Sequence, residues 1–229
     1  MKSLGVIGGV GPETTAEFYL QVIFGCQNTG TEHRPHIIIS SIPYSYELEN
    51  DEIIKGIITE QAREYLLTEA KRLEQAGADF IVLPCNSLHI FIEQVKESVK
   101  IPVLNILDEV VSYIISNKFL KIGLISTSST VKNKLYENEF IKHNIDFEIP
   151  NGLKRAEIDK IIKRITNGVH LNKDRITLLS IIEDFKKANC DAVALACTDL
   201  QLLLPSDDNI TIFDTMSVLT EASIREVLK

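Results

Sequence analysis

Two cysteines, Cys85 and Cys197, occupy similar settings, each directly after an apolar segment and before a run of polar residues. A thiol, with an unperturbed pKa of about 8.5, can accept or donate a proton close to neutral pH. Peptide N–H groups at a helix start would favour the thiolate, because they carry partial positive charge. Two such groups on opposite faces of one carbon could remove a proton from one side and return one to the other, which inverts a stereocentre without a cofactor.

Other polar clusters follow apolar segments in the same way. In parallel sheets, ligands bind beyond the carboxyl ends of the strands, and helix starts there favour carboxylate or phosphate groups. The glycine-rich loop is weak evidence alone, because Thr14 stands where a dinucleotide fingerprint has its third glycine and the Lys-Ser/Thr pair of a P-loop is missing. An empty glycine turn and a phosphate cradle therefore stay open as alternatives. The clusters are residues 8–15, 85–87, 126–130 and 197–199.

Metal binding and cysteine hydrolysis compete with proton transfer as roles for these residues. Cys85 and His89 are four residues apart, but Asp199 rather than a histidine follows Cys197, and the paired C-x-x-C spacing of structural zinc is absent. A nucleophilic Cys85 activated by His89 is disfavoured because Gln201 occupies the parallel position. We therefore expect no metal, and we expect His89 to orient its loop or to be partly exposed rather than to act as a base.

Composition limits the class of protein. The 229 residues are 45% hydrophobic and 24% charged, an ordinary globular balance, and no apolar run reaches the roughly 20 residues of a membrane-spanning helix. The net charge of -8, without a Lys/Arg block, argues against nucleic-acid and anionic-membrane partners. Four cysteines do not form a disulfide framework, and Cys26 and Cys190 read as small buried hydrophobes. With no signal-peptide pattern, the cytoplasm is the expected location.

The elements that would position these residues alternate along the chain. Short apolar strands and amphipathic helices follow one another, which predicts an α/β fold with a mainly parallel sheet. The predicted strands are residues 4–7, 37–42, 80–83, 103–106, 122–125, 147–149, 192–195 and 210–213. The predicted helices are residues 14–24, 60–75, 88–99, 131–143, 156–165, 178–187 and 218–228.

The second half of the chain resembles the first. Residues 2–7 parallel 120–125, residues 79–88 parallel 191–200, and residues 104–108 parallel 210–214. We therefore predict two similar Rossmann-like lobes related by a pseudo-two-fold axis, with the active site in the cleft between them. The first lobe would hold residues 1–112 and 213–229, and the second would hold residues 113–212. In this arrangement Cys85 and Cys197 face each other across the cleft.

The motifs resemble those of the aspartate/glutamate racemase family. GGVGPETT at 8–15, PCNSLH at 84–89, ACTDL at 196–200 and GLISTSST at 123–130, followed by Tyr136, are similar to the family patterns GGMGPxAT, PCNTAH, GCTE and GLLATxGT. The similarity runs nearly end to end, and the branch it resembles most is aspartate racemase.

This resemblance implies a pyridoxal-phosphate-independent amino-acid racemase, an isomerase without a cofactor, usually a homodimer. Cys85 and Cys197 match the catalytic pair, the first acting on the D-enantiomer and the second on the L-enantiomer. The implied substrate is an acidic amino acid, aspartate before glutamate. The positions that match substrate-binding residues, the first two through their backbone, are Val10, Gly11, Asn86, Ser87, Thr127, Thr130 and Thr198.

The sequence departs from the aspartate racemases where they hold the substrate's side chain. Residues 43–49 lack the expected Arg. The expected Lys falls near residues 166–167, although Lys163 and Arg164 lie within a turn of that position. The resemblance therefore supports the reaction more strongly than it supports an acidic substrate. A charge pair is among the stronger contacts available, and the residues expected to form one with the substrate's side chain are missing. Alternatives are a glutamate or broad-specificity racemase, a paired-cysteine enzyme acting on hydantoin or maleate, and a non-catalytic two-lobed module that binds a small carboxylate.

Overall fold

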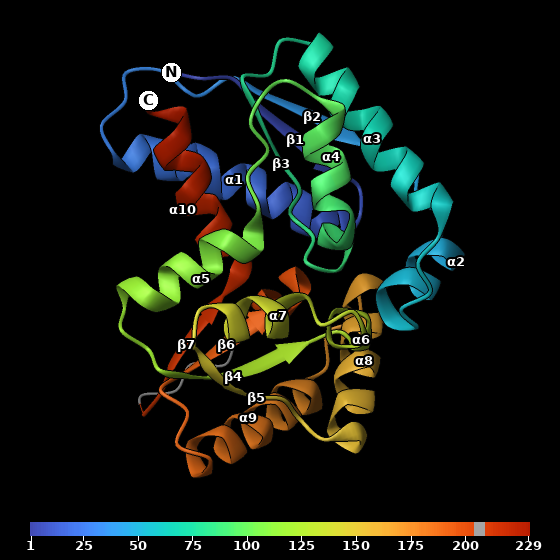
Figure 1. Ribbon diagram of the computed structural model, residues 1–229, viewed down its shortest axis with the longest axis vertical. Helices are drawn as coiled ribbons and strands as arrows, with labels where there is room; N and C mark the ends of the chain where they lie inside the picture. The colour runs from blue at the N-terminus through green and yellow to red at the C-terminus, as the bar shows by residue number, and fades with distance from the viewer. Residues whose placement is uncertain (204–208) are drawn as a thin grey trace.

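The computed structural model describes residues 1–203 and 209–229, except for the side chains of residues 53 and 54, and consists of two α/β lobes. Figure 1 shows one lobe above the other, each with a sheet flanked by helices. Every strand pairing in both sheets is parallel. The predicted α/β fold with two lobes is confirmed.

The first lobe contains a three-stranded sheet in the order β2-β1-β3. The central strand β1 is buried at every position, because helices cover both faces of the sheet. The strands are β1 (Leu4–Gly8), β2 (Ile37–Ser41) and β3 (Phe80–Val82). The helices are α1 (Pro12–Asn28), α2 (Tyr46–Glu49), α3 (Glu60–Gln75) and α4 (Ile92–Ser98), with a π-helical turn η1 (Asn50–Ile54) and a 3₁₀ turn η2 (Ser87–Phe91).

The second lobe contains a four-stranded sheet in the order β5-β4-β6-β7. Its inner strands are β4 and β6, and β6 is buried at every position. The strands are β4 (Lys121–Ser126), β5 (Asp146–Glu148), β6 (Ala192–Ala196) and β7 (Thr211–Asp214). The helices are α6 (Ser128–Lys132), α7 (Leu135–Lys142), α8 (Gly152–Thr166) and α9 (Asn172–Lys187), with a 3₁₀ turn η3 (Thr198–Leu203).

The two sheets follow the same plan, but the first lacks a full fourth strand. The strand predicted at residues 103–106 is wrong beyond Val103, which makes a single parallel bridge to Ile81. Helix α5 (Ile106–Ser116) begins instead, because the Asn105 side chain accepts a hydrogen bond from the Leu107 N–H and caps the helix. The parallel segment of the second lobe remains a strand, β7, before Asp214 caps helix α10 (Thr215–Val227).

Equivalent glycines in the two lobes support the internal duplication. Gly5 in β1 and Gly123 in β4 stand at matching positions of the repeated segments. A Cβ on Gly5 would lie 2.9 Å from the Ala78 Cβ, and one on Gly123 would lie 2.5 Å from the Phe185 ring. In both lobes, the residues packed on the central strand therefore approach it too closely for any side chain at that position.

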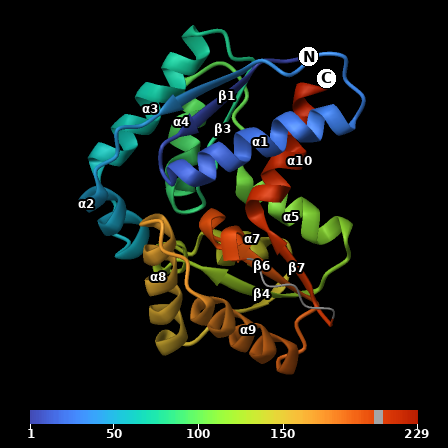
Figure 2. The same cartoon turned by 180° about the vertical axis from the view of Figure 1, so that it is seen from behind.

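Two helices join the lobes along one side. Helix α5 runs through the predicted boundary at residues 112/113, and α10 packs against both α1 and α5 (Figure 2). The largest apolar cluster extends through these helices into both lobes, from Phe18 on α1 through Ile114 on α5 to Phe140 on α7. Each lobe has a further cluster of its own, one containing Cys85 and the other Cys197. The domain limits themselves stay a prediction.

No helix in the described part of the chain is both long and apolar enough to cross a membrane.

Candidate active site

The two cysteine loops meet where the lobes face each other. Cys85 lies between strand β3 and turn η2, and Cys197 lies between strand β6 and turn η3. The Thr198 hydroxyl donates a hydrogen bond to the Pro84 carbonyl oxygen at 3.3 Å, which joins the residue after one cysteine to the residue before the other. Both cysteines are buried, with 7% and 5% of their surface exposed.

Burial controls the protonation of Cys85. It raises the pKa of the Cys85 thiol to about 12, and the negative charges of Asp199 and Glu49 act in the same direction. The N–H groups of Leu88 and Ser87, at the start of η2, lower the pKa but do not offset the burial. The helix-start effect expected from the sequence is therefore present, but in the free protein it is outweighed by burial and by carboxylates.

Cys197 lies in the same electrostatic environment. Burial raises the pKa of its thiol, and the Asp199 carboxylate, whose Oδ2 lies 3.6 Å from the Cys197 Sγ, raises it further. The charge of Cys85 also raises the pKa of Cys197. The ionisation of one cysteine therefore depends on the charge of the other.

Three hydroxyls form a buried triangle between the lobes. The Ser87 hydroxyl lies 3.0 Å from the Thr127 hydroxyl and 3.2 Å from the Thr130 hydroxyl, and the two threonine hydroxyls are 3.0 Å apart. Thr127 also caps helix α6 by accepting a hydrogen bond from the Thr130 N–H. Three of the residues predicted to bind substrate are therefore brought together, and one of them, Ser87, lies two positions after Cys85.

Asn86 is held by two side chains of the second lobe and its flanking helix. Its side-chain nitrogen donates to the Thr215 hydroxyl at 2.9 Å, and its side-chain oxygen accepts from the Tyr136 hydroxyl. The Thr215 hydroxyl in turn donates to the Leu195 carbonyl oxygen, close to Cys197. Because both ends of the Asn86 amide are engaged, this residue ties the first cysteine loop to strand β6.

The glycine-rich loop contacts the second cysteine loop. Val10 is buried within the first-lobe apolar cluster. Gly11 has a φ of 71°, and a Cβ there would lie 3.2 Å from Asp199 Oδ1. The Thr14 hydroxyl, in the first turn of α1, donates to that same carboxylate oxygen at 2.6 Å. The loop thus contacts Asp199 closely, through the backbone of Gly11 and the hydroxyl of Thr14.

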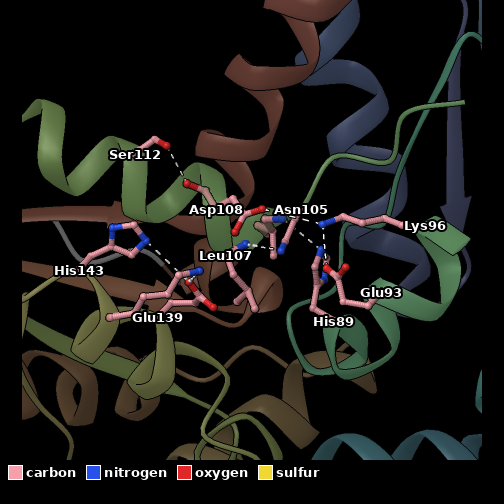
Figure 3. A network of polar contacts seen from close by, with 11 residues as sticks. His89, Glu93, Lys96, Asn105, Leu107, Asp108, Ser112, Glu139 and His143 are labelled. Atoms are coloured by element: carbon pink, nitrogen blue, oxygen red, sulfur yellow. Dashed lines mark hydrogen bonds and ion pairs between the residues drawn. The ribbon is translucent and has the colours of Figure 1, made fainter.

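His89 lies near Asn105 at the start of α5, within the polar network drawn in Figure 3. The Ile106 N–H donates to its Nε2 at 3.1 Å, so the ring proton lies on Nδ1, which donates to the Cys85 carbonyl oxygen at 2.7 Å. Burial lowers the pKa of His89 to about 4, so it is neutral at physiological pH. Both nitrogens are engaged, and neither faces the Cys85 sulfur or is free for a metal.

A cavity of about 300 Å³ opens between α2 of the first lobe and α8 of the second, which lie side by side in Figures 1 and 2. Glu47, Glu49 and Asn50 line one wall, and Lys163 and Asn167 line the other. The cysteines do not line it, but Glu49 connects it to them. Glu49 Oε1 accepts a hydrogen bond from the Gly11 N–H at 3.2 Å, and its charge acts on Cys85.

Comparison with known proteins identifies the family. Residues 7–223 match the model of the family described as Asp/Glu/Hydantoin racemase. The chain belongs to this family. Among curated proteins, this racemase is 26% identical over 234 residues to the broad specificity amino-acid racemase RacX of Bacillus subtilis, with 98% of each chain covered.

Solved structures share the fold of this racemase. A candidate Asp/Glu racemase from Yersinia pestis superposes with a TM-score of 0.88 at 26% identity, covering all of both chains. The aspartate racemase of Picrophilus torridus superposes with a TM-score of 0.82 over 100% of this chain and 95% of that one. Its identity of 24% makes it evidence for the fold alone. The predicted family and fold are thus confirmed, and the protein is an amino-acid racemase of the Asp/Glu racemase family.

Glu49 is the residue of this site that the sequence did not single out. The segment around it reads as a departure from the family pattern, with no element assigned. The sequence does contain a local signal, because a serine followed by Glu47 and Glu49 is typical of a helix start. In the structure the Ser45 side chain caps this helix by accepting a hydrogen bond from the Leu48 N–H. That helix, α2, carries Glu49 to the cavity and to the Gly11 N–H.

The described residues contain no group of three or more His, Cys, Asp or Glu side chains arranged to hold a metal ion.

Proposed function

We propose that this racemase inverts the α-carbon of an amino acid by a two-base mechanism with Cys85 and Cys197, without a cofactor. The observation that carries the proposal is the contact between the cysteine loops, from the Thr198 hydroxyl to the Pro84 carbonyl oxygen. This contact supports the proposal because it joins the residue after Cys197 to the residue before Cys85, and in the proposed mechanism each thiol serves one face of a bound α-carbon.

The proton transfer balances without any co-reactant. One cysteine, as thiolate, takes the α-proton and leaves the bonding electrons on the substrate. The opposite thiol donates its proton to the other face of that carbon and becomes the thiolate. The product is the mirror image of the substrate, and the next turnover from that product runs in reverse.

The surroundings supply stabilisation for each charge that forms. N–H groups of Ser87 and Leu88 point at Cys85, and that of Asp199 points at Cys197. The hydroxyls of Ser87, Thr127 and Thr130 could turn from one another toward a substrate carboxylate, which gains negative charge as the proton leaves. Val10, Gly11, Asn86 and Thr198 complete the binding residues that the resemblance assigns.

The substrate's own ammonium group offsets the carboxylates that hold both cysteines protonated. Asp199 has no Lys, Arg or His partner among the described residues, and its bonds come from Thr14 and Cys197. An ammonium group beside it would neutralise the charge that raises the pKa of both thiols. The reactive thiolate therefore forms mainly when substrate is bound.

Aspartate is the first substrate to test and glutamate the second, because the motifs resemble aspartate racemases. The resemblance also assigns Cys85 to the D-enantiomer and Cys197 to the L-enantiomer, and it predicts a homodimer. The cytoplasm is the location expected from the sequence pattern. Broad specificity is the alternative favoured by the similarity to RacX.

The test is to incubate the protein with each L-amino acid in deuterium oxide and to measure α-deuteration and chirality together. Cys85→Ser and Cys197→Ser should each lower racemisation by about 10³-fold or more, since each removes one acid–base group. Cys26→Ser and Cys190→Ser are matched controls, because these cysteines are also buried but lie outside the site. A Cys85 or Cys197 variant with near-full turnover would remove the two-base mechanism and favour another paired-cysteine role or the binding module.

A further inference from the structure

The cavity between α2 and α8 is of the size that a substrate side chain would need. Its volume of about 300 Å³ lies at the lower end of small-molecule pockets. It adjoins the cysteine loops through Glu49, whose Oε1 binds the Gly11 N–H, and Gly11 in turn approaches Asp199. A side chain extending from an α-carbon held between the cysteines would therefore pass Glu49.

Glu49 is a half-buried carboxylate without a cation. Its recorded hydrogen bond comes from the Gly11 N–H, and within the described residues no Lys, Arg or His side chain pairs with it. Burial raises the pKa of Glu49, and the charge of Asp199 raises it further. The carboxylate therefore lacks a strong donor, which a ligand could supply.

Hydrogen bonds to the neighbouring Glu52 anchor the segment that carries Glu49. Turn η1, which follows α2 directly, contains the buried Glu52. The Glu52 carboxylate accepts hydrogen bonds from the Tyr44 hydroxyl and from the N–H and hydroxyl of Thr59. These bonds tie together the segments on both sides of α2 and η1, so Glu49 is presented from an anchored segment.

The charges around the cavity disfavour a second carboxylate. Glu47 and Glu49 lie on one wall, and Lys163 is the one cation on the other. A side-chain carboxylate would have to approach the unpaired Glu49, whereas an amide, hydroxyl, ammonium or guanidinium group would donate a hydrogen bond to it. Asn50 and Asn167 add neutral donors and acceptors to the lining.

We propose that Glu49 is the specificity-determining residue of this racemase, selecting amino acids whose side chain carries a hydrogen-bond donor and no negative charge. The inference rests on the proposed function, because it uses the same site and the same bound α-carbon. It replaces aspartate, the substrate that the sequence resemblance implies, with non-acidic polar amino acids such as glutamine, asparagine and lysine.

The test compares amino acids of nearly equal shape, glutamine with glutamate and asparagine with aspartate. We expect kcat/KM to favour each amide over its acid by about tenfold or more, because rejecting an unpaired like charge is worth at least that. Glu49→Gln should narrow this ratio by about tenfold, and Glu49→Arg should reverse it. Glu97→Gln is the matched control and should leave the ratio within about twofold, because Glu97 is an exposed glutamate that does not line the cavity.

Calorimetric binding of the same amino acids separates this inference from the proposed function. Preferential binding of the amides without α-deuteration would uphold the role of Glu49 and overturn racemisation. Racemisation with a preference for aspartate or glutamate, or with a ratio that Glu49→Gln leaves unchanged, would overturn the role of Glu49 and uphold racemisation. Binding of neither class, with no exchange, would overturn both.

Discussion

The two cysteine loops share a backbone plan but differ in their polar neighbours. Cys85 and Cys197 each follow a buried strand, precede a 3₁₀ turn and receive backbone N–H groups. Two residues later, the first loop has Ser87, which joins a cluster of hydroxyls, and the second has Asp199, which faces its own cysteine. The two loops therefore share a backbone geometry but give their cysteines different electrostatic settings.

The difference fixes the order in which the thiols ionise. The charge of Cys85 raises the pKa of Cys197, and the nearest carboxylate is bonded to Cys197 rather than to Cys85. We therefore expect Cys85 to lose its proton first in the free protein. We therefore expect the two thiols to be unequal before substrate binds, although the loops that carry them are similar.

The largest effect expected is on α-proton exchange in variants with a single site cysteine. Cys85→Ala and Cys197→Ala should each lose racemisation by about 10³-fold, because no group returns a proton to the opposite face. The remaining cysteine can still exchange the proton on its own face, so each variant should deuterate one enantiomer only, and the two variants should differ in which one. Proton NMR in deuterium oxide with separate D- and L-amino acids measures this. Exchange of the same enantiomer by both variants would contradict the assignment of one cysteine to each face of the α-carbon.

The next effect expected is on stability, through the residue four positions after each cysteine. His89→Ala would leave the Cys85 carbonyl and the Ile106 N–H without a partner in a buried place, at a cost of about 3 kcal/mol in the free energy of unfolding. Gln201→Ala, its counterpart in the second loop, should cost less, since the Gln201 contacts are with Met216 and Gln21 and are only partly buried. Urea denaturation of both variants measures the two costs, and equal costs would contradict the asymmetry.

His89 also gives the first cysteine loop a pH dependence, whereas Gln201, its counterpart in the second loop, cannot titrate. Burial holds its pKa at about 4, below the roughly 6.5 of an unfolded histidine. Between these values the unfolded chain binds a proton that the folded chain does not, so the free energy of unfolding should fall as the pH drops from 6.5 to 4. The total change from this group is on the order of 3 kcal/mol. Denaturation across this range should show a shallower slope for His89→Gln than for the wild type.

The sequence was sufficient for the parts of the fold that repeat. Residues 80–83 and 192–195 are short apolar segments that are typical of buried strands. Because Gly5 and Gly123 also stand at matching positions of the repeat, the two lobes and the positions of their cysteines could be predicted. The failure at residues 103–106 has a local cause. An Asn at 105 can cap a helix as well as continue a loop, and β-branched neighbours do not distinguish a bridge from a strand.

The polar network of the site could be predicted only in part. Ser87, Thr127 and Thr130 belong to recognisable motifs, but their mutual distances depend on how the two lobes pack. Burial raises the pKa of both Glu49 and Asp199, and the charge of Asp199 raises that of Glu49 further, which no local pattern encodes. The same holds for the thiols, whose helix-start setting predicts a lowered pKa while burial raises it.

A smaller effect is expected on thiol reactivity when the second loop loses its carboxylate. Asp199→Asn removes the charge that raises the pKa of both cysteines, so thiolate should form at lower pH. A decrease of about one pKa unit would speed alkylation of Cys197 near pH 8 about tenfold. Labelling followed by mass spectrometry measures each cysteine separately, and Cys26 and Cys190 provide internal controls. An unchanged rate at Cys197 would mean that burial alone keeps its thiol protonated.

The smallest effect expected concerns the residues that directly follow the two cysteines. Asn86 is held by Tyr136 and Thr215, whereas Thr198 is held by the Pro84 carbonyl oxygen alone. Tyr136→Phe should cost about 1 kcal/mol in the free energy of unfolding, because Asn86 keeps its second anchor, and Thr198→Val should cost a similar amount. In catalysis the two should differ, because Thr198→Val releases the contact between the loops and Tyr136→Phe does not. If only Thr198→Val loses kcat, the hydrogen bond to the Pro84 carbonyl oxygen aligns the two sulfurs. If both variants lose kcat equally, the packing of the lobes aligns them.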